Sequence, residues 1–459
     1  MFWLLLLAGG VTYVLSQFVL KTLYISNRFF QLLAVNTCLF LIAFFFPGME
    51  MPAQVFFLLL VIALVADLFF LFVINRKPFI ERMIPERLSN GDENPVHLQI
   101  QNRYPFSVKL EVIDELPMQF QKRDFSIKLQ LKPGENRLLN YHLRPVERGE
   151  YQFGNVQVFV QSLLGLVERK FIGAEERMIP VYPSFIRMRQ YQLQAEAAQT
   201  KEAGNRRLRK IGHSMEFEQV KEYVQGDDVR NINWKATARK TSLMVNSYTD
   251  EKSQQVYCII DKGRLMKMPF NDLTLLDHAI NASLVMCNVA VYRQDKFGLL
   301  TFSNKMGSVL AADRKPVQLE KVLQLLYNQQ TAFLESDFEL LYTQIRATIK
   351  QRSLLILFTN FESLAGMQRQ MLYLKRIAKY HLLLLVFFEN TELKQVAVQN
   401  VADIEDLYVK TIAGKYMHEK QLIVKELQNA GILSILTAPE NVTVNTINKY
   451  IEIKTRQAI

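Results

Sequence analysis

Three apolar runs fill most of the first 75 residues and constrain the fold more than any other feature of the chain. Residues 29–46 and 55–74 each have roughly the 20 residues that a helix needs to cross the hydrocarbon core of a bilayer. Residues 47–52 (Pro-Gly-Met-Glu-Met-Pro) separate these two runs with helix breakers. The sequence therefore predicts a helical hairpin in the lipid bilayer.

The remaining run, residues 2–20, contains Gly9, Gly10 and Gln17. A signal peptide would begin with basic residues and end at a small-residue cleavage site, and neither pattern is evident here. We expect a third spanning helix; an interfacial helix and an extension without a function are the alternatives. Residues 1–75 are thus predicted to form an anchor of two or three helices that contacts lipid through residues 2–74.

Basic residues around the hairpin predict its orientation. Residues 47–52 contain no Lys or Arg, whereas both outer ends of the hairpin carry basic side chains (Lys21, Arg28, Arg76, Lys77, Arg82 and Arg87). Because cytoplasmic loops are enriched in Lys and Arg, we expect residue 76 onward to lie in the cytoplasm.

Asp67 interrupts the second run of the hairpin. An ionisable group in lipid is costly, which makes such a residue a functional candidate by default. The interpretation that we favour is structural: a helix–helix hydrogen bond, or a position on an interior face.

Residues 76–183 alternate apolar and polar side chains, as strands do when one face packs on a core. The alternation is clear in residues 96–100, 108–112, 125–131 and 156–160. Turn sequences such as Pro133-Gly134-Glu135 separate these segments. Several short strands at this spacing predict an all-β, immunoglobulin-like sandwich.

Residues 184–254 change character, and the first part of this segment is rich in Gln, Glu, Lys and Arg. It reads as a polar linker with helical portions and a basic cluster (Arg206, Arg207, Arg209 and Lys210). The formal net charge of the chain is +11, which is as compatible with an anionic protein, a membrane or nucleic acid as with no specific partner. We favour an arm near an anionic membrane surface or an acidic protein over nucleic acid.

Residues 255–459 alternate continuous apolar strands with helices, which predicts an α/β domain with a mainly parallel sheet covered on both faces. Ligands of such sheets bind at the carboxyl ends of the strands. Asp261 follows the first strand run, and Thr359 and Asn360 follow the run at residues 354–358. These positions make a candidate site.

A divalent cation at Asp261 would need further oxygen ligands. The residues that follow are Lys262, Gly263 and Arg264, so hydroxyl groups are missing and cations intrude. Asn360 stands where a second carboxylate would help. We therefore expect a degenerate site at Asp261, Gly263, Thr359 and Asn360 that holds no metal, and no cofactor for the chain.

Residues 223–239 (YVQGDDVRNINWKATAR) place charged groups, a turn glycine and a tryptophan at close spacing. Gly226-Asp227 suits a tight turn in which the Asp side chain accepts backbone N–H groups. Arg230 or Arg239 can pair with Asp227 or Asp228 through two hydrogen bonds. An apolar anchor at Trp234 favours either an inter-domain clasp or a surface for a partner protein.

Paired carboxylates at Asp227 and Asp228 could also serve acid–base chemistry in a hydrolase. Neighbouring arginines would keep both groups ionised, which disfavours a general acid. The sequence therefore favours a protein that is not an enzyme.

The motif also carries a family resemblance. Its positions (Tyr223, Gly226, Asp227, Asp228, Arg230, Ile232, Trp234, Ala238 and Arg239) resemble the signature of the domain-of-unknown-function family fifty-eight. Residues 148–154 and 164–166 resemble the sandwich region of that family.

The resemblance implies a bacterial protein in the inner membrane, with a von Willebrand factor A-like C-terminal domain. It also implies a MoxR-type AAA ATPase as the partner, in the assembly of a complex. The metal-site aspartate of such a domain would correspond to Asp261, but the Asp-x-Ser-x-Ser pattern is absent here. We expect a scaffold or adaptor that faces the cytoplasm, with a metal-dependent ligand-binding protein and a hydrolase as alternatives.

Overall fold

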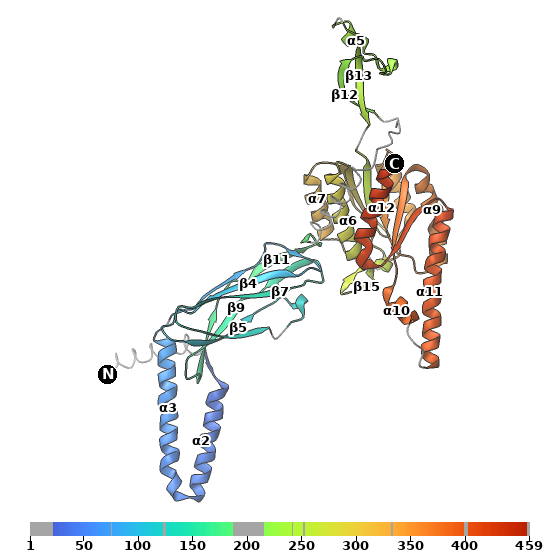
Figure 1. Cartoon of the computed structure of the whole chain (residues 1–459). Coiled ribbons are helices and arrows are strands. Elements are labelled where there is room, and N and C mark those ends of the chain that lie inside the picture. The colour runs from blue at the N-terminus through green and yellow to red at the C-terminus, as the bar shows by residue number, and fades with distance from the viewer. Residues whose placement is uncertain are drawn as a thin grey trace, which may run out of the picture. The chain divides into compact units, whose positions relative to one another are not determined.

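The computed structural model describes residues 22–74, 76–122, 125–186, 215–240, 242–250, 253–331, 334–398 and 403–456 (Figure 1). The chain divides into two compact units, Met1–Tyr182 and Pro183–Ile459. The apolar run at residues 2–20 and the basic cluster at residues 206–210 lie outside the described residues.

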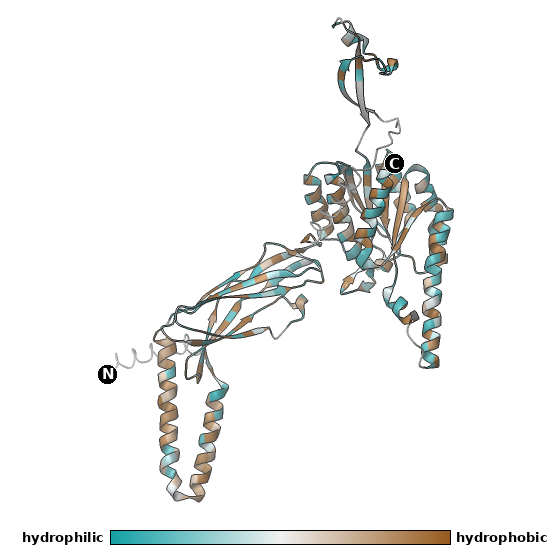
Figure 2. Cartoon of the chain, viewed as in Figure 1, coloured by the Kyte–Doolittle hydropathy of each residue, from teal (hydrophilic) through white to brown (hydrophobic). Residues whose placement is uncertain are grey.

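The hairpin expected from the two apolar runs is present as helices α2 (Asn27–Phe45) and α3 (Glu50–Phe72), joined by η1 (Pro47–Met49). Apolar side chains are exposed along both helices, and Figure 2 shows the hairpin as predominantly hydrophobic. Both helices are long and apolar enough to cross a membrane. A further helix that meets this criterion, α6 (Leu275–Tyr292), is mostly buried in the second unit and forms part of its core.

The first unit continues as the expected β-rich region. A five-stranded sheet has the order β1-β10-β9-β5-β6, and two three-stranded sheets have the orders β3-β11-β8 and β2-β4-β7. Inward-facing residues alternate along these strands and form the core, as the period-two pattern predicts. The strands are β1 (Leu23–Ile25), β2 (Phe79–Met83), β3 (Leu88–Ser89), β4 (Asn94–Gln101), β5 (Val108–Asp114), β6 (Ser126–Leu131), β7 (Asn136–Leu143), β8 (Gly149–Phe153), β9 (Val156–Gln161), β10 (Val167–Ile172) and β11 (Arg177–Tyr182); a short 3₁₀ turn, η2, spans Met118–Phe120.

Asp67 joins the helical hairpin to this β-rich region. Its carboxylate accepts hydrogen bonds from the backbone N–H groups of Leu166 (2.8 Å) and Val167 (3.0 Å), and from the hydroxyl of Ser162. The predicted interior position is confirmed, because Asp67 is fully buried. The predicted helix–helix hydrogen bond is wrong, because the donors to Asp67 come from β10 and the loop before it.

The carboxyl end of α3 is fixed by the same strands. The carbonyl oxygen of Leu71 accepts hydrogen bonds from Arg169 (2.7 Å) and from the hydroxyl of Tyr104 (3.3 Å). These bonds satisfy one of the backbone carbonyls that a helix leaves unpaired at its end. Residues 164–166 of the family resemblance lie at this junction, where Gly165 has a φ of +67°.

The other sandwich motif, residues 148–154, has a packing role. The hydroxyl of buried Tyr151 donates to the carbonyl oxygen of Glu147 (2.9 Å), which fixes the preceding turn. Gly154 lies directly against the side chain of Glu115, where a Cβ atom would collide. The motif therefore has a glycine at residue 154 because Glu115 packs against it, and an aromatic residue at 151 because that position is buried.

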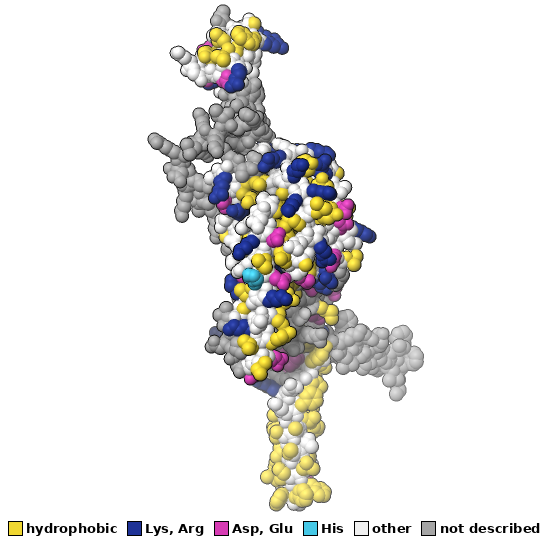
Figure 3. All heavy atoms as spheres, turned by 90° about the vertical axis from the view of Figure 1, so that its right-hand side faces the viewer, with side chains coloured by type: hydrophobic (Ala, Val, Ile, Leu, Met, Phe, Trp, Pro, Cys, Tyr) yellow, Lys and Arg dark blue, Asp and Glu magenta, His cyan; other side chains and the backbone are white. Residues whose placement is uncertain are grey.

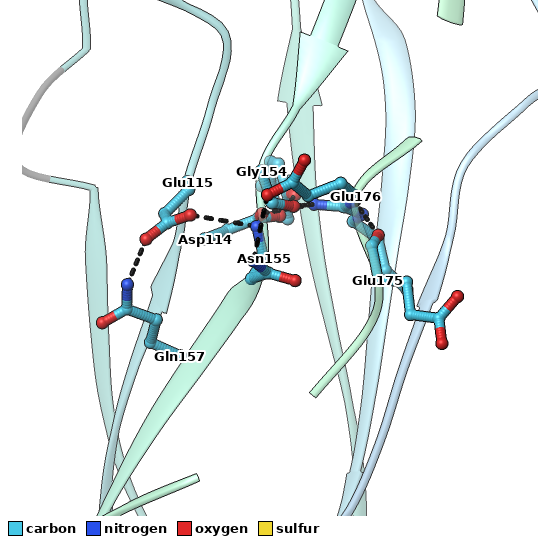
Figure 4. A network of polar contacts seen from close by, with 9 residues as sticks. Asp114, Glu115, Gly154, Asn155, Gln157, Glu175 and Glu176 are labelled. Atoms are coloured by element: carbon cyan, nitrogen blue, oxygen red, sulfur yellow. Dashed lines mark hydrogen bonds and ion pairs between the residues drawn. The ribbon is translucent and has the colours of Figure 1, made fainter. Parts of the chain in front are cut away.

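A buried ion pair crosses the sandwich beside this motif (Figure 4). Arg82 lies 2.7 Å from Asp114, and it also donates to the carbonyl oxygens of Gly154 (3.0 Å) and Glu175 (3.1 Å). The hydroxyl of Tyr141 donates to the second oxygen of Asp114. Burial raises the pKa of Asp114, and the nearby Arg82 opposes that rise. These contacts tie β2, β5, β7 and the turn after β8 together.

The second unit begins with a two-stranded antiparallel hairpin, β12 (Met215–Glu222) and β13 (Met244–Asp250). The polar linker with helical portions was predicted in the first part of residues 184–254, so that prediction is wrong for β12, and β13 was not predicted. Apolar residues are few among the polar side chains of β12, so its alternation is weak. Its partner strand β13 begins more than 20 residues later, so no short turn sequence marks the hairpin. Between the strands lie η3 (Val229–Asn231) and the short helix α5 (Trp234–Thr237).

The α/β region has one mixed sheet with strand order β18-β17-β14-β19-β20-β21. All neighbouring strands are parallel except β18, which pairs antiparallel with β17 at the edge. The strands are β14 (Gln255–Asp261), β17 (Lys296–Phe302), β18 (Met306–Asp313), β19 (Leu354–Phe358), β20 (Leu382–Phe388) and β21 (Leu433–Thr437). Helices cover both faces of the sheet, which is why the parallel strands are continuously apolar (Figure 1).

The helices of this region are α6, α7 (Val317–Tyr327), α8 (Phe338–Thr348), α9 (Leu364–Tyr380), α10 (Thr391–Val398), α11 (Ile404–Asn429) and α12 (Val442–Thr455). Short elements complete it: η4 (Arg264–Lys267), β15 (Pro269–Phe270), β16 (Leu273–Thr274) and η5 (Pro439–Asn441). The sequence pattern did not predict β18, α8, α10 or α11. The largest omission, α11, has only three buried residues, so it lacks the regular apolar stripe of a core helix.

Candidate functional site

The carboxyl ends of two adjacent parallel strands bring together the residues singled out in the α/β region. Asp261 is the last residue of β14, and Thr359 follows β19. The Thr359 hydroxyl donates a 2.6 Å hydrogen bond to one carboxylate oxygen of Asp261. The backbone N–H of Gly263 donates to the other oxygen at 2.7 Å.

Ser336 supplies a further hydroxyl to Asp261, from the loop before α8. Ser336 was not predicted, because it lies 75 positions from Asp261 and a pattern of hydroxyl groups directly after the strand does not include it. A Cβ atom at Gly263 would collide with the Ser336 hydroxyl, so a larger residue here would displace that hydroxyl from Asp261. We call Asp261, Gly263, Ser336 and Thr359 the edge cluster.

The edge cluster is a hydrogen-bonded carboxylate in a buried position. Burial raises the pKa of Asp261, and the Ser336, Thr359 and Gly263 donors oppose that rise. A divalent cation would need the oxygen lone pairs that these contacts use, and it would find a single carboxylate in the cluster. Among the described residues, no three or more His, Cys, Asp or Glu side chains form a metal-binding group. The cluster is a poor fit to a magnesium site.

Asn360 does not join the edge cluster. Its side-chain oxygen accepts a 2.7 Å hydrogen bond from the ammonium of Lys420, on α11. Lys420 also donates to the carbonyl oxygen of Phe361. Burial lowers the pKa of Lys420 to about 8, and Glu362 opposes that shift. Nothing in the sequence pattern marked Lys420, because a lysine on a helix is usually exposed.

Asn360 and Lys420 line a pocket of about 500 Å³ at the carboxyl edge of the sheet. Its walls come from the β15 region, the loops after β19 and β20, and α11. The lining combines apolar side chains with Glu362, Glu389 and Glu392. Its position agrees with the general rule for ligand sites in parallel sheets.

The motif at residues 223–239 lies between the strands of the β12–β13 hairpin. Asp227 forms the expected turn: its N–H donates to the carbonyl oxygen of Val224 (2.9 Å), and its carboxylate accepts from the N–H of Val224 (3.1 Å). Gly226 has a φ of +114°, which favours glycine. The cation beside Asp227 is Lys221 (2.9 Å), and not one of the two predicted arginines.

Asp228 makes the other ion pair of the motif. Arg230 approaches it through Nε and Nη2, the latter at 2.9 Å, in the expected two-contact arrangement. Hydrogen bonds from Lys221 and from Arg230 lower the pKa of Asp227 and of Asp228, respectively. Both carboxylates are therefore ionised at neutral pH.

The second half of the motif folds back on β13. Ile232 bridges Val245, and the N–H of Asn233 donates to the carbonyl oxygen of Met244 (2.9 Å). Trp234 begins α5 and is 70% exposed, so within the described residues it does not pack as a buried anchor. Ala238 and Arg239 are exposed at the end of α5. Tyr223 is half-buried, and its N–H donates to the carbonyl oxygen of Leu243 (2.8 Å).

A family model matches the part of the chain that contains the motif at residues 223–239. Residues 219–416 match the family model described as "Protein of unknown function DUF58". This match includes the hairpin motif, the edge cluster and the first half of α11.

A relative from Bacillus subtilis (strain 168), the uncharacterized protein YeaD, is 26% identical over 223 residues. The alignment covers 47% of this chain and 56% of YeaD, so the chain spans about half the length of the curated relative it matches. Among solved structures, the hypothetical protein BatB from Bacteroides thetaiotaomicron is 10% identical; the match covers 44% of this chain and 100% of BatB, with a TM-score of 0.28. A CARDB domain from Pyrococcus furiosus is 14% identical over 23% of this chain and 92% of that domain, with a TM-score of 0.16.

Proposed function

We propose that this chain is a membrane-anchored adaptor that binds a partner protein through the end of its β12–β13 hairpin. The observation that carries the proposal is an exposed apolar group beside a two-contact ion pair. Val224, Val229 and Trp234 are all more than half exposed, and the Asp228–Arg230 pair flanks Val229 in the chain. We call these five residues the docking tip.

The composition of the docking tip supports binding over a structural role. An exposed tryptophan contributes nothing to a core, and it leaves apolar surface in water. Tryptophan and arginine are the residues that most often dominate binding energy at protein interfaces. The turn at Gly226-Asp227 and the bridge from Ile232 to β13 hold these side chains on a defined backbone.

The type of C-terminal domain, the partner and the membrane side are proposed on separate grounds. The family resemblance supports a von Willebrand factor A-like C-terminal domain and a MoxR-type AAA ATPase as the partner, in the assembly or maturation of a complex. The basic residues that flank the hairpin support the cytoplasmic side of a bacterial inner membrane. Nucleic acid is not part of the proposal.

The test is affinity purification of the full-length protein in detergent, read by mass spectrometry. Wild type is compared with Trp234→Ala/Arg230→Ala, and with Leu372→Ala as a matched control that removes an exposed apolar side chain from α9. We expect an ATPase with the wild type and the control, and its loss with the docking-tip variant. Equal recovery from all three would contradict docking through the tip. Recovery of a different protein, lost in the same variant, would contradict the ATPase alone.

The hydrolase alternative is less well supported by the motif. An acid catalyst needs a carboxyl group that stays protonated near neutral pH, whereas ion pairs lower the pKa of both Asp227 and Asp228. A hydrolytic activity that disappears in a folded Asp227→Asn variant would favour this alternative instead.

A further inference from the structure

The loop between β9 and β10 leaves two leucines exposed beside the apolar hairpin. Leu163 is 74% exposed and Leu164 is 44% exposed. We call residues 162–166 the junction loop. The loop is fixed to α3, because the hydroxyl of Ser162 donates a hydrogen bond to the carboxylate of Asp67. The junction loop therefore lies at the level of Asp67 along the hairpin.

The length of α3 shows where that level falls in a bilayer. From Glu50, the first residue of α3, to Asp67 is roughly 25 Å at the rise of an α-helix. The hydrocarbon core of a bilayer is roughly 30 Å thick. Apolar residues continue past Asp67 as far as Ile74, and Figure 3 shows hydrophobic side chains along the hairpin. The junction loop thus lies at a depth where the hairpin is still apolar.

The other helix of the hairpin gives the same level. The N–H of Ser26, the residue that caps α2, donates to the carbonyl oxygen of Leu166 at 3.0 Å. From Phe45 at the far end of α2 back to Asn27 is roughly 27 Å. Both helices therefore place the junction loop just inside the boundary of the hydrocarbon core.

The hydrogen bonds of the junction loop suit an apolar setting. Irregular backbone is tolerated at membrane depth only where its polar groups are bonded within the protein. The N–H of Leu164 donates to the Ser162 hydroxyl (3.2 Å), and the N–H groups of Leu166 and Val167 donate to Asp67 (2.8 and 3.0 Å). The leucine side chains that the loop exposes favour hydrocarbon over water.

Basic and aromatic side chains follow the junction loop on β10 and its neighbours. Arg169 lies over the ring of Phe72, 4.6 Å from its centroid, and Lys170 lies over the ring of Phe159 at 5.9 Å. Aromatic and basic residues of this kind are typical of the membrane–water interface, where the cations reach anionic lipid headgroups. This composition favours a lipid surface over a protein as the partner of the loop.

We propose that the junction loop inserts Leu163 and Leu164 into the lipid bilayer, so that the β-rich region contacts the membrane directly and not only through the helical hairpin. The occupant follows from continuity, since the loop is bonded to a helix whose exposed surface is itself apolar and long enough to cross a membrane. The inference rests on the membrane anchoring that is part of the proposed function.

Depth-dependent fluorescence quenching tests the insertion. The full-length protein with Leu163→Cys, in a Cys38→Ser background, is labelled with an environment-sensitive fluorophore and reconstituted into vesicles of phosphatidylcholine and phosphatidylglycerol. Cys258 and Cys287 are buried and should stay unlabelled. We expect blue-shifted emission, and loss of most of the fluorescence when the lipids carry a nitroxide on the acyl chain.

Met118→Cys is the matched control, because Met118 is an 88% exposed apolar residue of the same β-rich region. It follows β5, whose end at Asp114 pairs with Val156, at the opposite end of β9 from the junction loop. A label there should emit as in water and escape quenching by the acyl-chain nitroxide. Leu58→Cys, at a 59% exposed position of α3, reports whether the hairpin itself lies in the bilayer.

The three labels separate the loop from the anchor. Quenching at Leu58 and Leu163 but not at Met118 is the result that we expect. Quenching at Leu58 without quenching at Leu163 would overturn the inserted loop and leave the membrane anchor intact. No quenching at either position would overturn both, and equal quenching at all three would overturn insertion at the junction loop.

Discussion

The carboxylate of Asp67 accepts a 2.8 Å hydrogen bond from the backbone N–H of Leu166, which links the second apolar helix to the β-rich region. Together with the bonds from Val167 and Ser162, this contact fills both oxygens of the carboxylate. An aspartate in an apolar helix is therefore matched by donors from a strand and its preceding loop. Asp67 thus joins the hairpin to the sandwich within one compact unit.

Replacing Asp67 by Ala should destabilise this unit by about 3 kcal/mol, because two backbone N–H groups and a hydroxyl lose their acceptor in a buried position. Thermal unfolding of the full-length protein in detergent measures the effect. Thr37→Val is the control: it removes an exposed polar group from α2 and should change stability by less than about 0.5 kcal/mol. Equal effects of the two changes would show that Asp67 contributes nothing specific.

The buried Arg82–Asp114 pair should respond very differently from an exposed pair. The Arg82 side chain is 2% exposed and that of Asp114 is fully buried, so Arg82→Met leaves an uncompensated carboxylate. We expect a loss of about 3–5 kcal/mol. Arg82→Met/Asp114→Leu should lose less than the single change, because no charge is then left alone. Arg137→Met, which breaks the exposed pair with Glu135, should cost under about 1 kcal/mol. Chemical denaturation of the four proteins gives the comparison.

Two glycines should respond with opposite signs to a single added methyl group. At Gly154 a Cβ would lie 2.5 Å from Oε2 and 2.7 Å from Cβ of Glu115, so Gly154→Ala should destabilise by about 1–3 kcal/mol. At Gly414, within α11, no atom lies within 4 Å of the added Cβ. Gly414→Ala should therefore stabilise the helix by about 0.5–1 kcal/mol. A shift of both melting temperatures in one direction would contradict the close approach at Gly154.

Lys420 should lose its proton at a lower pH than other lysines. Burial lowers its pKa from 10.5 to about 8, so a large share of its amine is neutral near pH 8. Labelling with an amine-reactive anhydride, followed by peptide mapping, should reach its half-maximal rate near that pH. Between pH 8 and 10.5 the unfolded chain binds more protons at this residue, so the free energy of unfolding should rise with pH there. Lys420→Met should abolish that rise, and a labelling midpoint above pH 10 would contradict the shift.

Parts of the fold follow from local patterns in the sequence. The helices of the apolar hairpin were predicted from run length, and the sandwich strands from period-two alternation. The buried strands of the α/β sheet, such as β19 and β20, were predicted from continuous apolar runs. The hairpin strands β12 and β13 and the helix α11 were not predicted, because their apolar residues are too few or too exposed to give a periodic signal.

The sequence by itself determined which segments can span a bilayer, which form strands, and where Asp261 and the motif at residues 223–239 stand in that order. The tertiary structure decided their partners. Ser336 reaches Asp261 from 75 positions away, Lys420 reaches Asn360 from 60, and Leu166 reaches Asp67 from 99. A local sequence pattern indicates which side chains of one segment face water and which face a core. The contacts above depend instead on how segments distant in sequence pack together. Only the folded chain brings such donors and acceptors within hydrogen-bonding distance.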